Sequence, residues 1–414
     1  MGTIWKNYRG TISLLLGIII GGLIGLLLKD KAAILDPFGQ LFLNLMYMIL
    51  IPLVFFSITN AIGQMGNKGR LGKILGATVL VFLFTSVVAA VIGYLGVRIF
   101  PIINSSDIDS LKDLMGAVKG QQESTSFLQQ IVNLFTVDDF SKLLSKDNML
   151  PMIVFSLLVG LATSSSGEKA QSFRDFLNSG NEIILKAVKF IMYYAPVGLG
   201  CYFAVIVGSL GSKIINGYLH SFLLYLVLSV IYFGGVMTLY AFIAYKKAGI
   251  KTFWQNILVP AATALATSSS AASIPANLTY GKKMGIDDDI VDTVIPLGAN
   301  IHKDGSVIGG IFKITFLFLL FGRDITDPMN ILEIIFTGFF VGAVMGAIPG
   351  GGLVAETLIV SLFGFPTSAI PLIVIISTII DVPATLLNST SNVTSALMVN
   401  RLVGKKQLSP TNIK

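Results

Sequence analysis

The sequence predicts an all-α membrane protein, and three observations lead to this fold class. Charged residues make up 12% of the 414 residues, whereas a soluble domain carries roughly a quarter. Apolar residues make up 54%, and the mean hydropathy is +0.80. Long apolar segments alternate with short loops in which basic residues gather. The composition excludes a soluble enzyme or nucleic-acid-binding protein, and the net charge of +7 is expected from cytoplasmic loops.

Six apolar segments are long enough to cross a bilayer, which needs about 20 residues. They are residues 10–28, 39–62, 74–100, 147–165, 180–211 and 218–245. Basic residues precede the first segment and follow every second one, as at Lys68, Arg70 and Lys73. Because cytoplasmic loops are enriched in Lys and Arg, these clusters and the N-terminus are expected on the cytoplasmic side.

The next apolar segment, residues 252–280, does not cross the membrane in this scheme. Lys251 precedes it and Lys282 follows it, so both ends face the same side. Its centre, residues 266–271, is rich in serine and alanine and is suited to a turn buried in protein. We therefore predict a re-entrant helical hairpin, followed by an outward-crossing helix over 289–321.

The same pattern recurs in the opposite orientation. Residues 329–364 are apolar on both sides of Pro349–Gly352, a sequence that no continuous helix tolerates. Residues 367–403 then return to a basic end, so the C-terminus is also expected in the cytoplasm. The prediction is thus eight transmembrane helices plus two re-entrant hairpins, arranged as inverted repeats. The two hairpin tips and two polar helix breaks should meet near the bilayer midplane.

A polar stripe on the last helix marks a binding surface. Asp381, Thr385, Asn388 and Asn392 are spaced by 4, 3 and 4 residues and so share one helix face. A charged side chain at the bilayer centre costs at least about 2.5–3.5 kcal/mol, which requires partners or water. Hydrogen bonding between helices is the alternative explanation, although it seldom needs an ionisable aspartate.

The order of motifs resembles the dicarboxylate/amino acid:cation symporter family, which has the glutamate-transporter fold. The matching motifs are Asn148–Pro151, Tyr194–Gly198, the serine-rich hairpin, Pro296–Asn300, Asp304–Ser306, Pro349–Gly352 and Asn388–Asn392. The resemblance covers residues 10–405. It implies a homotrimer in the cytoplasmic membrane in which a mobile transport domain slides along a scaffold, an elevator mechanism.

The resemblance also implies a division of the chain. Residues 1–100 would hold helices 1–3, with helix 3 in the transport domain. Residues 101–250 would hold a loop and helices 4–6, with helix 6 in the transport domain. Residues 251–405 would form the transport core of hairpin 1, helix 7, hairpin 2 and helix 8, before a cytoplasmic tail at 406–414.

Site residues are carried over from the family by position. The expected substrate-binding residues are Ser269, Ser270, Ser306, Gly350, Gly351, Asp381, Thr385 and Asn388. In the family, residues at the positions of Ser270 and Asn388 hold the α-carboxylate of an amino acid, and the aspartate at Asp381 takes its ammonium group. The expected ion-coupling residues are Thr85, Ser86, Gly298, His302, Lys303, Asp304, Asn388 and Asn392.

One departure from the family bears on the substrate. An arginine that binds the side-chain carboxylate of acidic substrates is replaced by Ala384, and the arginine near the first hairpin's serines by Ser268. A second carboxylate would have no bidentate partner, which predicts a small neutral amino acid. Lys303 is another candidate to pair with a second carboxylate of the substrate. A dicarboxylate or acidic amino acid carried with Na+ therefore stays as the alternative.

Other departures bear on the coupling ion. Where the family has the motif Asn-Met-Asp-Gly-Thr, this chain has His302–Ser306. Three further ion-binding residues of the family are replaced: an aspartate by Asn392, a tyrosine by Phe82 and a threonine by Met345. We expect the ammonium of Lys303 to replace a sodium ion, paired with Asp304 or directed at Asn388. With His302 as a second proton carrier, transport would be proton-coupled or cation-independent. The alternative is a static Lys303–Asp304 pair with Na+ at Thr85, Ser86 and Asp304.

Glu356 follows the second hairpin's centre, and three interpretations stay open for it. It is a gate residue or proton acceptor, a charge at the external membrane face, which is the interpretation we favour, or the partner of Lys313.

Other function classes fit less well. An ion channel does not explain the mid-membrane aspartate, and the serines that an intramembrane enzyme would use lie in a redundant cluster. We therefore expect a transporter without a cofactor, whose partners are an amino acid or dicarboxylate and membrane lipids.

Overall fold

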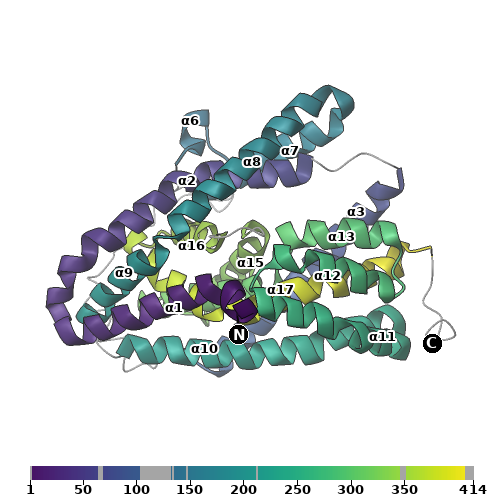
Figure 1. Ribbon diagram of the computed structural model, residues 1–414. Coiled ribbons are helices and arrows are strands. Elements are labelled where there is room, and N and C mark those ends of the chain that lie inside the picture. Colours follow the sequence, from purple (N-terminus) through teal and green to yellow (C-terminus); the bar gives the residue numbers. More distant parts are fainter. Residues whose placement is uncertain are drawn as a thin grey trace.

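The computed structural model describes residues 2–63, 69–102, 132, 135–145, 148–210, 213–345 and 351–405. Within these ranges every regular element is a helix, which confirms the predicted all-α class (Figure 1). The N-terminal half contains α1 (Gly2–Leu28), α2 (Asp36–Gly63), α3 (Gly69–Ile99), α6 (Phe140–Leu143), α7 (Met149–Ser165), α8 (Gln171–Met192), α9 (Ala195–Leu210) and α10 (Lys213–Ile231). The C-terminal half contains α11 (Met237–Thr267), α12 (Ser270–Lys283), α13 (Asp288–Ile301), α14 (Asp304–Leu320), α15 (Pro328–Val344), α16 (Gly351–Phe363) and α17 (Ile370–Val403).

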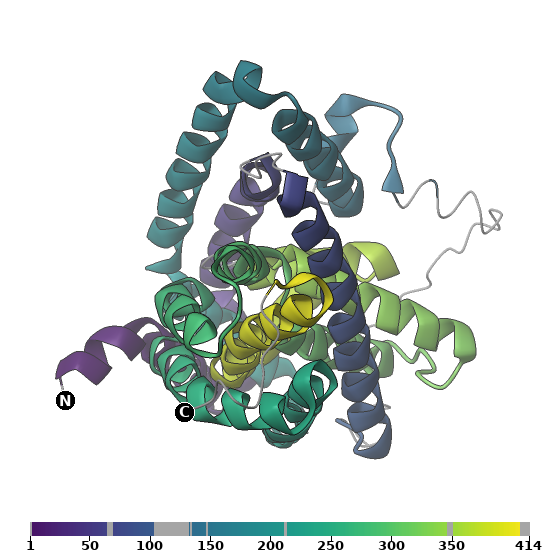
Figure 2. The same ribbon diagram turned by 90° about the vertical axis from the view of Figure 1, so that its right-hand side faces the viewer.

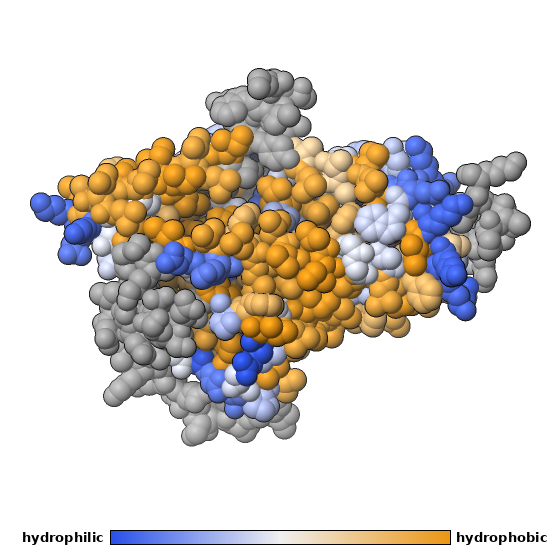
Figure 3. Space-filling view, turned by 90° about the horizontal axis from the view of Figure 1, so that it is seen from below, coloured by the Kyte–Doolittle hydropathy of each residue, from blue (hydrophilic) through white to orange (hydrophobic). Residues whose placement is uncertain are grey.

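The surface of the molecule suits a lipid environment. Figure 3 shows a broad apolar face between hydrophilic ends. Among the described residues, four helical stretches are long and apolar enough to span a membrane: Ile12–Asn60, Gly72–Ile99, Ile215–Thr267 and Thr367–Val403. A fifth is added if the bent pair α8 and α9 forms one span. The chain is therefore a multi-pass membrane protein, and the count of eight helices stays a prediction.

The predicted span at 180–211 is not one continuous helix. The structure places two helices there, α8 and α9, bent by 53° at Tyr193 and Tyr194. The break precedes Pro196, which lacks the N–H that a continuous helix would need. α9 packs closely on α1, because a Cβ at Gly21 would overlap the carbonyl of Gly200. Glycines thus bring these two backbones together.

The first hairpin forms where the serines predict it. α11 is interrupted at Lys246 (φ +50°), then runs to Thr267 and stops because Ser268 has a left-handed backbone (φ +47°). Ser269 is extended, and its hydroxyl accepts a hydrogen bond from the N–H of Ala272 at 3.2 Å, which caps α12. The chain therefore reverses within two residues, and α11 and α12 form the arms of the hairpin.

The second hairpin has α15 and α16 as its arms. Asp327 caps α15 by accepting hydrogen bonds from the N–H groups of Met329 and Asn330. The turn itself, residues 346–350, lies outside the described residues, so the predicted site residue Gly350 does as well. Gly351 is the first residue of α16.

Of the two predicted helix breaks, one is observed. His302 is extended and Lys303 is non-helical, and these two residues separate α13 from α14. The predicted break in 367–403 is wrong, because α17 is one helix of 34 residues. Its C-terminal part lies in the middle of the surrounding helices (Figure 2). Its polar side chains bond to its own backbone, as where Thr390 donates to the carbonyl of Leu386 at 2.7 Å. Polar side chains satisfied in this way do not require the backbone to open.

Candidate substrate and cation site

α12, the second arm of the first hairpin, packs along α17. Asn277 on α12 donates hydrogen bonds to the backbone oxygen and the hydroxyl of Ser389 on α17, at 3.0 and 2.9 Å. Further along, the N–H of Asp287 donates to Asn400, so the two chain segments run in the same direction. Ser270 is two turns before Asn277, about 10 Å back along the helix. This places Ser270 at the level of Asp381 to Thr385 of α17.

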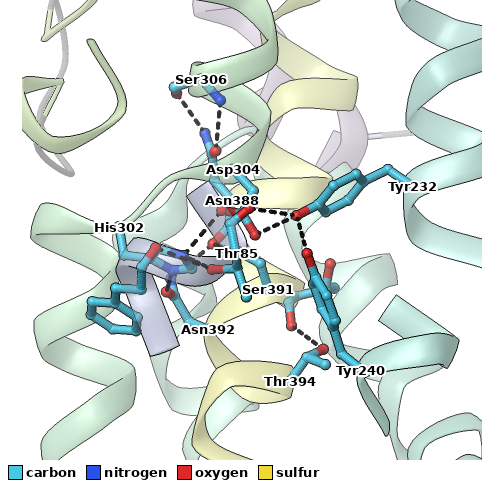
Figure 4. Close-up of polar contacts among 12 residues, drawn as sticks. Thr85, Tyr232, Tyr240, His302, Asp304, Ser306, Asn388, Ser391, Asn392 and Thr394 are labelled. Carbon is cyan, nitrogen blue, oxygen red and sulfur yellow. Dashed lines mark hydrogen bonds and ion pairs between the residues drawn. The ribbon is translucent and has the colours of Figure 1, made fainter. Parts of the chain in front are cut away.

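Ser306 and Asn388, two predicted substrate-binding residues, contact each other directly. The N–H of Ser306 donates to Asn388 Oδ1 at 3.0 Å, and Asn388 Nδ2 donates to Ser306 Oγ at 3.0 Å (Figure 4). Both side chains are buried. The start of α14 is thereby joined to the polar stripe of α17. A bound carboxylate would meet hydroxyl and amide donors at this junction.

Asp381 and Thr385 lie on the same face of α17 as Asn388. Ala384 lies on this face between Asp381 and Asn388 and is buried. The polar stripe is therefore interrupted there by a small apolar side chain. Lys303, which is buried, interacts electrostatically with Asp381. The site therefore holds one acidic and one basic group on opposite elements, the helix break and α17.

His302 lies at the centre of the predicted cation site. Its Nε2 is 2.7 Å from Thr85 Oγ1 and 3.0 Å from Asp304 Oδ1, and its Nδ1 is 2.9 Å from Asn392 Oδ1 (Figure 4). Its ring stacks on Phe82, with centroids 4.0 Å apart and an interplanar angle of 6°. The imidazole thus lies among three oxygens that come from three different elements.

The hydrogen-bond network fixes which atom faces the imidazole. Asn392 Nδ2 donates to the carbonyl of Asn388 at 2.8 Å, so Oδ1 of Asn392 faces the ring. Nδ1 of His302 consequently carries a proton and donates to Asn392. The oxygens of Thr85, Asp304 and Asn392 therefore surround an imidazole that donates a proton to one of them.

Close packing between α13 and α17 is required for this arrangement. A Cβ at Gly298 would overlap Asn392 Oδ1 and approach the Phe82 ring to 3.0 Å. The predicted site residue Gly298 therefore acts by leaving room for the side chains of Asn392 and Phe82. Ser86, beside Thr85 on α3, is also buried.

The expected pairing of Lys303 with Asp304 is replaced by other contacts. Oδ1 of Asp304 faces His302, and Oδ2 accepts a hydrogen bond from the hydroxyl of Tyr232 at 2.9 Å. Lys303 instead interacts with Asp381. The charge of Lys303 therefore acts on Asp381, a predicted substrate-binding residue. His302 instead contacts Thr85 and Asp304, which are predicted ion-coupling residues.

Sequence reasoning missed a group of tyrosines. Tyr232 begins a π-helical turn, Tyr232–Val236, between α10 and α11, and its hydroxyl also lies 3.4 Å from that of Tyr240. Tyr225 donates to the carbonyl of Gly305 at 2.7 Å. The available signal was the spacing of Tyr225 and Tyr232, seven residues apart in an apolar segment, which puts both hydroxyls on one face.

Glu356 is buried, and the interpretation as a charge at the membrane face is wrong. Lys313 Nζ donates to Glu356 Oε1 at 2.8 Å and to Ser377 Oγ at 3.0 Å. The hydroxyl of Ser377 also donates to Glu356 Oε1. The side chains of Lys313 and Glu356 are 1% and 0% exposed. The three residues, which we name the Lys–Glu–Ser cluster, join α14, α16 and α17.

Comparison with known proteins identifies the family. Residues 11–402 match the sodium:dicarboxylate symporter family. The chain is 27% identical to a proton/sodium-glutamate symport protein of Bacillus caldotenax over 98% of its own length and 95% of that protein. It is 26% identical to a C4-dicarboxylate transport protein of Bacillus subtilis (89% and 87% covered) and to neutral amino acid transporter B(0) of Oryctolagus cuniculus (95% and 78% covered). The chain is therefore a transport protein, not an enzyme, and belongs to the sodium:dicarboxylate symporter family.

Proposed function

We propose that the protein is a secondary active transporter of a small neutral amino acid across the cytoplasmic membrane. The observation that carries this proposal is the face of α17 on which Asp381, Ala384 and Asn388 follow one another, with Ser306 bonded to Asn388. Asp381 would take the ammonium group, and Ser306, Asn388 and Ser270 the α-carboxylate. Ala384 leaves the substrate's side chain without a cationic partner on this face of α17.

The coupling ion in this proposal is a proton, or no cation is needed. A sodium ion binds through several hard oxygen ligands, by analogy with other hard cations. Here the imidazole of His302 contacts Thr85, Asp304 and Asn392, and its Nδ1 presents a proton. Transport would be coupled to protons through His302 and Lys303, or would run without a coupling cation.

The second candidate is a Na+-coupled symporter of a dicarboxylate or acidic amino acid. The names of the Bacillus relatives favour it, since they carry glutamate or C4-dicarboxylates. Lys303 would then serve as the counter-charge of the second carboxylate. Na+ would use the oxygens of Thr85, Ser86 and Asp304 after the His302 ring turns away.

The mechanism we propose is an elevator movement within a homotrimer, with both termini in the cytoplasm. Residues 1–100 and 101–250 supply the scaffold, apart from helices 3 and 6, which move with the core 251–405. The contacts of α17 with α12 and α14 support a core that moves as one unit.

Uptake into proteoliposomes tests the proposal. The purified full-length chain is given labelled serine, alanine, glutamate or succinate under separate sodium, pH and voltage gradients. We expect saturable uptake of serine or alanine that a sodium gradient does not stimulate. Sodium-driven uptake of glutamate or succinate, with no uptake of neutral amino acids, would favour the second candidate.

A further inference from the structure

The Lys–Glu–Ser cluster has one oxygen that the cluster itself does not use. Oε1 of Glu356 accepts from both Lys313 and Ser377, whereas Oε2 accepts no hydrogen bond from any residue in the described part of the chain. Glu356 is 0% exposed. A buried carboxylate oxygen without a donor is costly, so its persistence points to a ligand that supplies one.

The unused oxygen lies beside the first turn of α16, near the end of α15. A Cβ at Gly352, the second residue of α16, would lie 3.4 Å from Glu356 Oε2 and 3.7 Å from the end of Met345. Met345 directly follows α15, on which a Cβ at Gly342 would lie 3.2 Å from the carbonyl of Lys303. The arms of the second hairpin therefore contact Glu356 at one point and the α13–α14 break, at Lys303, at another.

The cluster also lies next to the residue expected to bind the substrate's ammonium group. Ser377 and Asp381 are one turn apart on the same face of α17, so their Cβ atoms are about 5–6 Å apart. Lys313 follows Ser306 by seven residues, and its side chain tilts back toward the start of α14. The cluster thus lies about one helical turn from Asp381 along α17.

We propose that Glu356 Oε2 binds the side chain of the substrate, and that the substrate class is uncharged amino acids whose side chain donates a hydrogen bond. This inference rests on the proposed function. An amino acid whose ammonium group is bound by Asp381 would have its side chain about one helical turn away, where Ser377 contacts Glu356. Hydroxyl, thiol and primary amide side chains supply the donor that the oxygen lacks.

Charge excludes the other side-chain classes. An acidic side chain would bring a carboxylate against the carboxylate of Glu356. A basic one would bring a second cation toward Lys313, which already neutralises Glu356 at 2.8 Å. An apolar side chain would leave Oε2 buried without a donor, which is the strongest form of discrimination that a polar pocket achieves.

Uptake of isosteric substrates tests the inference. Initial rates are measured with proteoliposomes of the full-length chain for labelled threonine against valine, and serine against alanine. We expect kcat/KM for threonine to exceed that for valine by about 10-fold or more, as for a hydrogen bond to a charged group. A ratio near one in the unmodified protein would overturn the inference, whether or not any variant folds.

A double variant locates the preference. Lys313→Met with Glu356→Met removes both charges together, so no unpaired charge is left in the core. Its threonine preference should fall below about 3-fold while alanine uptake persists. Glu333→Met, the same change at an exposed glutamate of α15, is the control and should keep the preference. A double variant that keeps the 10-fold preference would refute the role of Glu356.

The outcomes also separate this inference from the proposed function. If no neutral amino acid is taken up, the proposed function fails. If alanine, serine, valine and threonine are all taken up at similar efficiency, the proposed function stands and the inference about Glu356 falls.

Discussion

Nδ1 of His302 lies 2.9 Å from Oδ1 of Asn392, so the helix break and α17 are joined by a hydrogen bond between two buried side chains. Phe82 holds the imidazole plane by stacking, and Thr85 and Asp304 approach Nε2 from the other side. The imidazole of His302 therefore occupies the space between the predicted ion-coupling residues Thr85, Asp304 and Asn392.

His302→Asn should make transport dependent on sodium. The shorter amide leaves space between Thr85, Asp304 and Asn392 and supplies an oxygen ligand in place of a nitrogen donor. Uptake should rise severalfold when sodium replaces potassium outside the vesicles. His220→Asn, the same change at the exposed histidine, should have no effect. Equal uptake in both salts by the His302 variant would contradict this account of the site.

Asp381→Asn should weaken substrate binding by about 100-fold, because an ammonium group would lose a charge-assisted hydrogen bond worth about 1.5–3 kcal/mol. Isothermal titration of the detergent-solubilised protein with serine gives the affinity. Asp292→Asn is a suitable control, since that aspartate is exposed and pairs with Lys282. Unchanged affinity in the Asp381 variant would remove this residue from the binding site.

Gly298→Ala should destabilise the protein by about 1–3 kcal/mol, as overpacking does. The added methyl group would overlap Asn392 Oδ1 and press on Phe82. Thermal unfolding in detergent should show a lower melting temperature, together with loss of uptake. Gly76→Ala on α3 is the control, because nothing lies within 4 Å of a Cβ there. Equal melting temperatures for the two variants would show that the gap at Gly298 is not needed.

Ala384→Arg should admit acidic substrates. The guanidinium would stand between Asp381 and Asn388 on the substrate face of α17 and would bind a second carboxylate in bidentate fashion. Labelled aspartate uptake should appear in this variant, and serine uptake should decline. Ala384→Lys provides the comparison, since a lysine lacks the planar fork. Serine selectivity that persists in the arginine variant would argue against the pose proposed here.

The sequence predicts some parts of this molecule well for identifiable physical reasons. Three serines flanked by lysines on the same side of the membrane predict the first hairpin, and the structure turns at Ser268 and Ser269. The break at His302–Lys303 was likewise expected, since charged residues there interrupt an apolar segment. Both features depend on local backbone chemistry, which can be recognised without a structure.

Other parts depend on contacts between distant segments and were missed. α17 was expected to break at its polar residues, but their side chains bond within the helix, as from Asn392 to Asn388. Tyr232 reaches Asp304 across 72 residues of sequence, and Phe82 reaches His302 across more than 200. No local pattern specifies such partners, because only packing of the helices decides which side chains meet.

Three pairs of ionisable groups in the described core have opposite charges when ionised: Lys313 and Glu356, 2.8 Å apart, His302 and Asp304, 3.0 Å apart, and Lys303 and Asp381, whose charges act on each other. When both members of a pair are ionised, their charges cancel. A single elementary charge moved across a membrane potential of 100 mV changes the energy by about 2.3 kcal/mol. If transport needs no coupling cation, a core with these three pairs ionised would reorient at nearly the same rate in an energised cell and a depolarised one, whereas a coupled proton would make that rate depend on the potential.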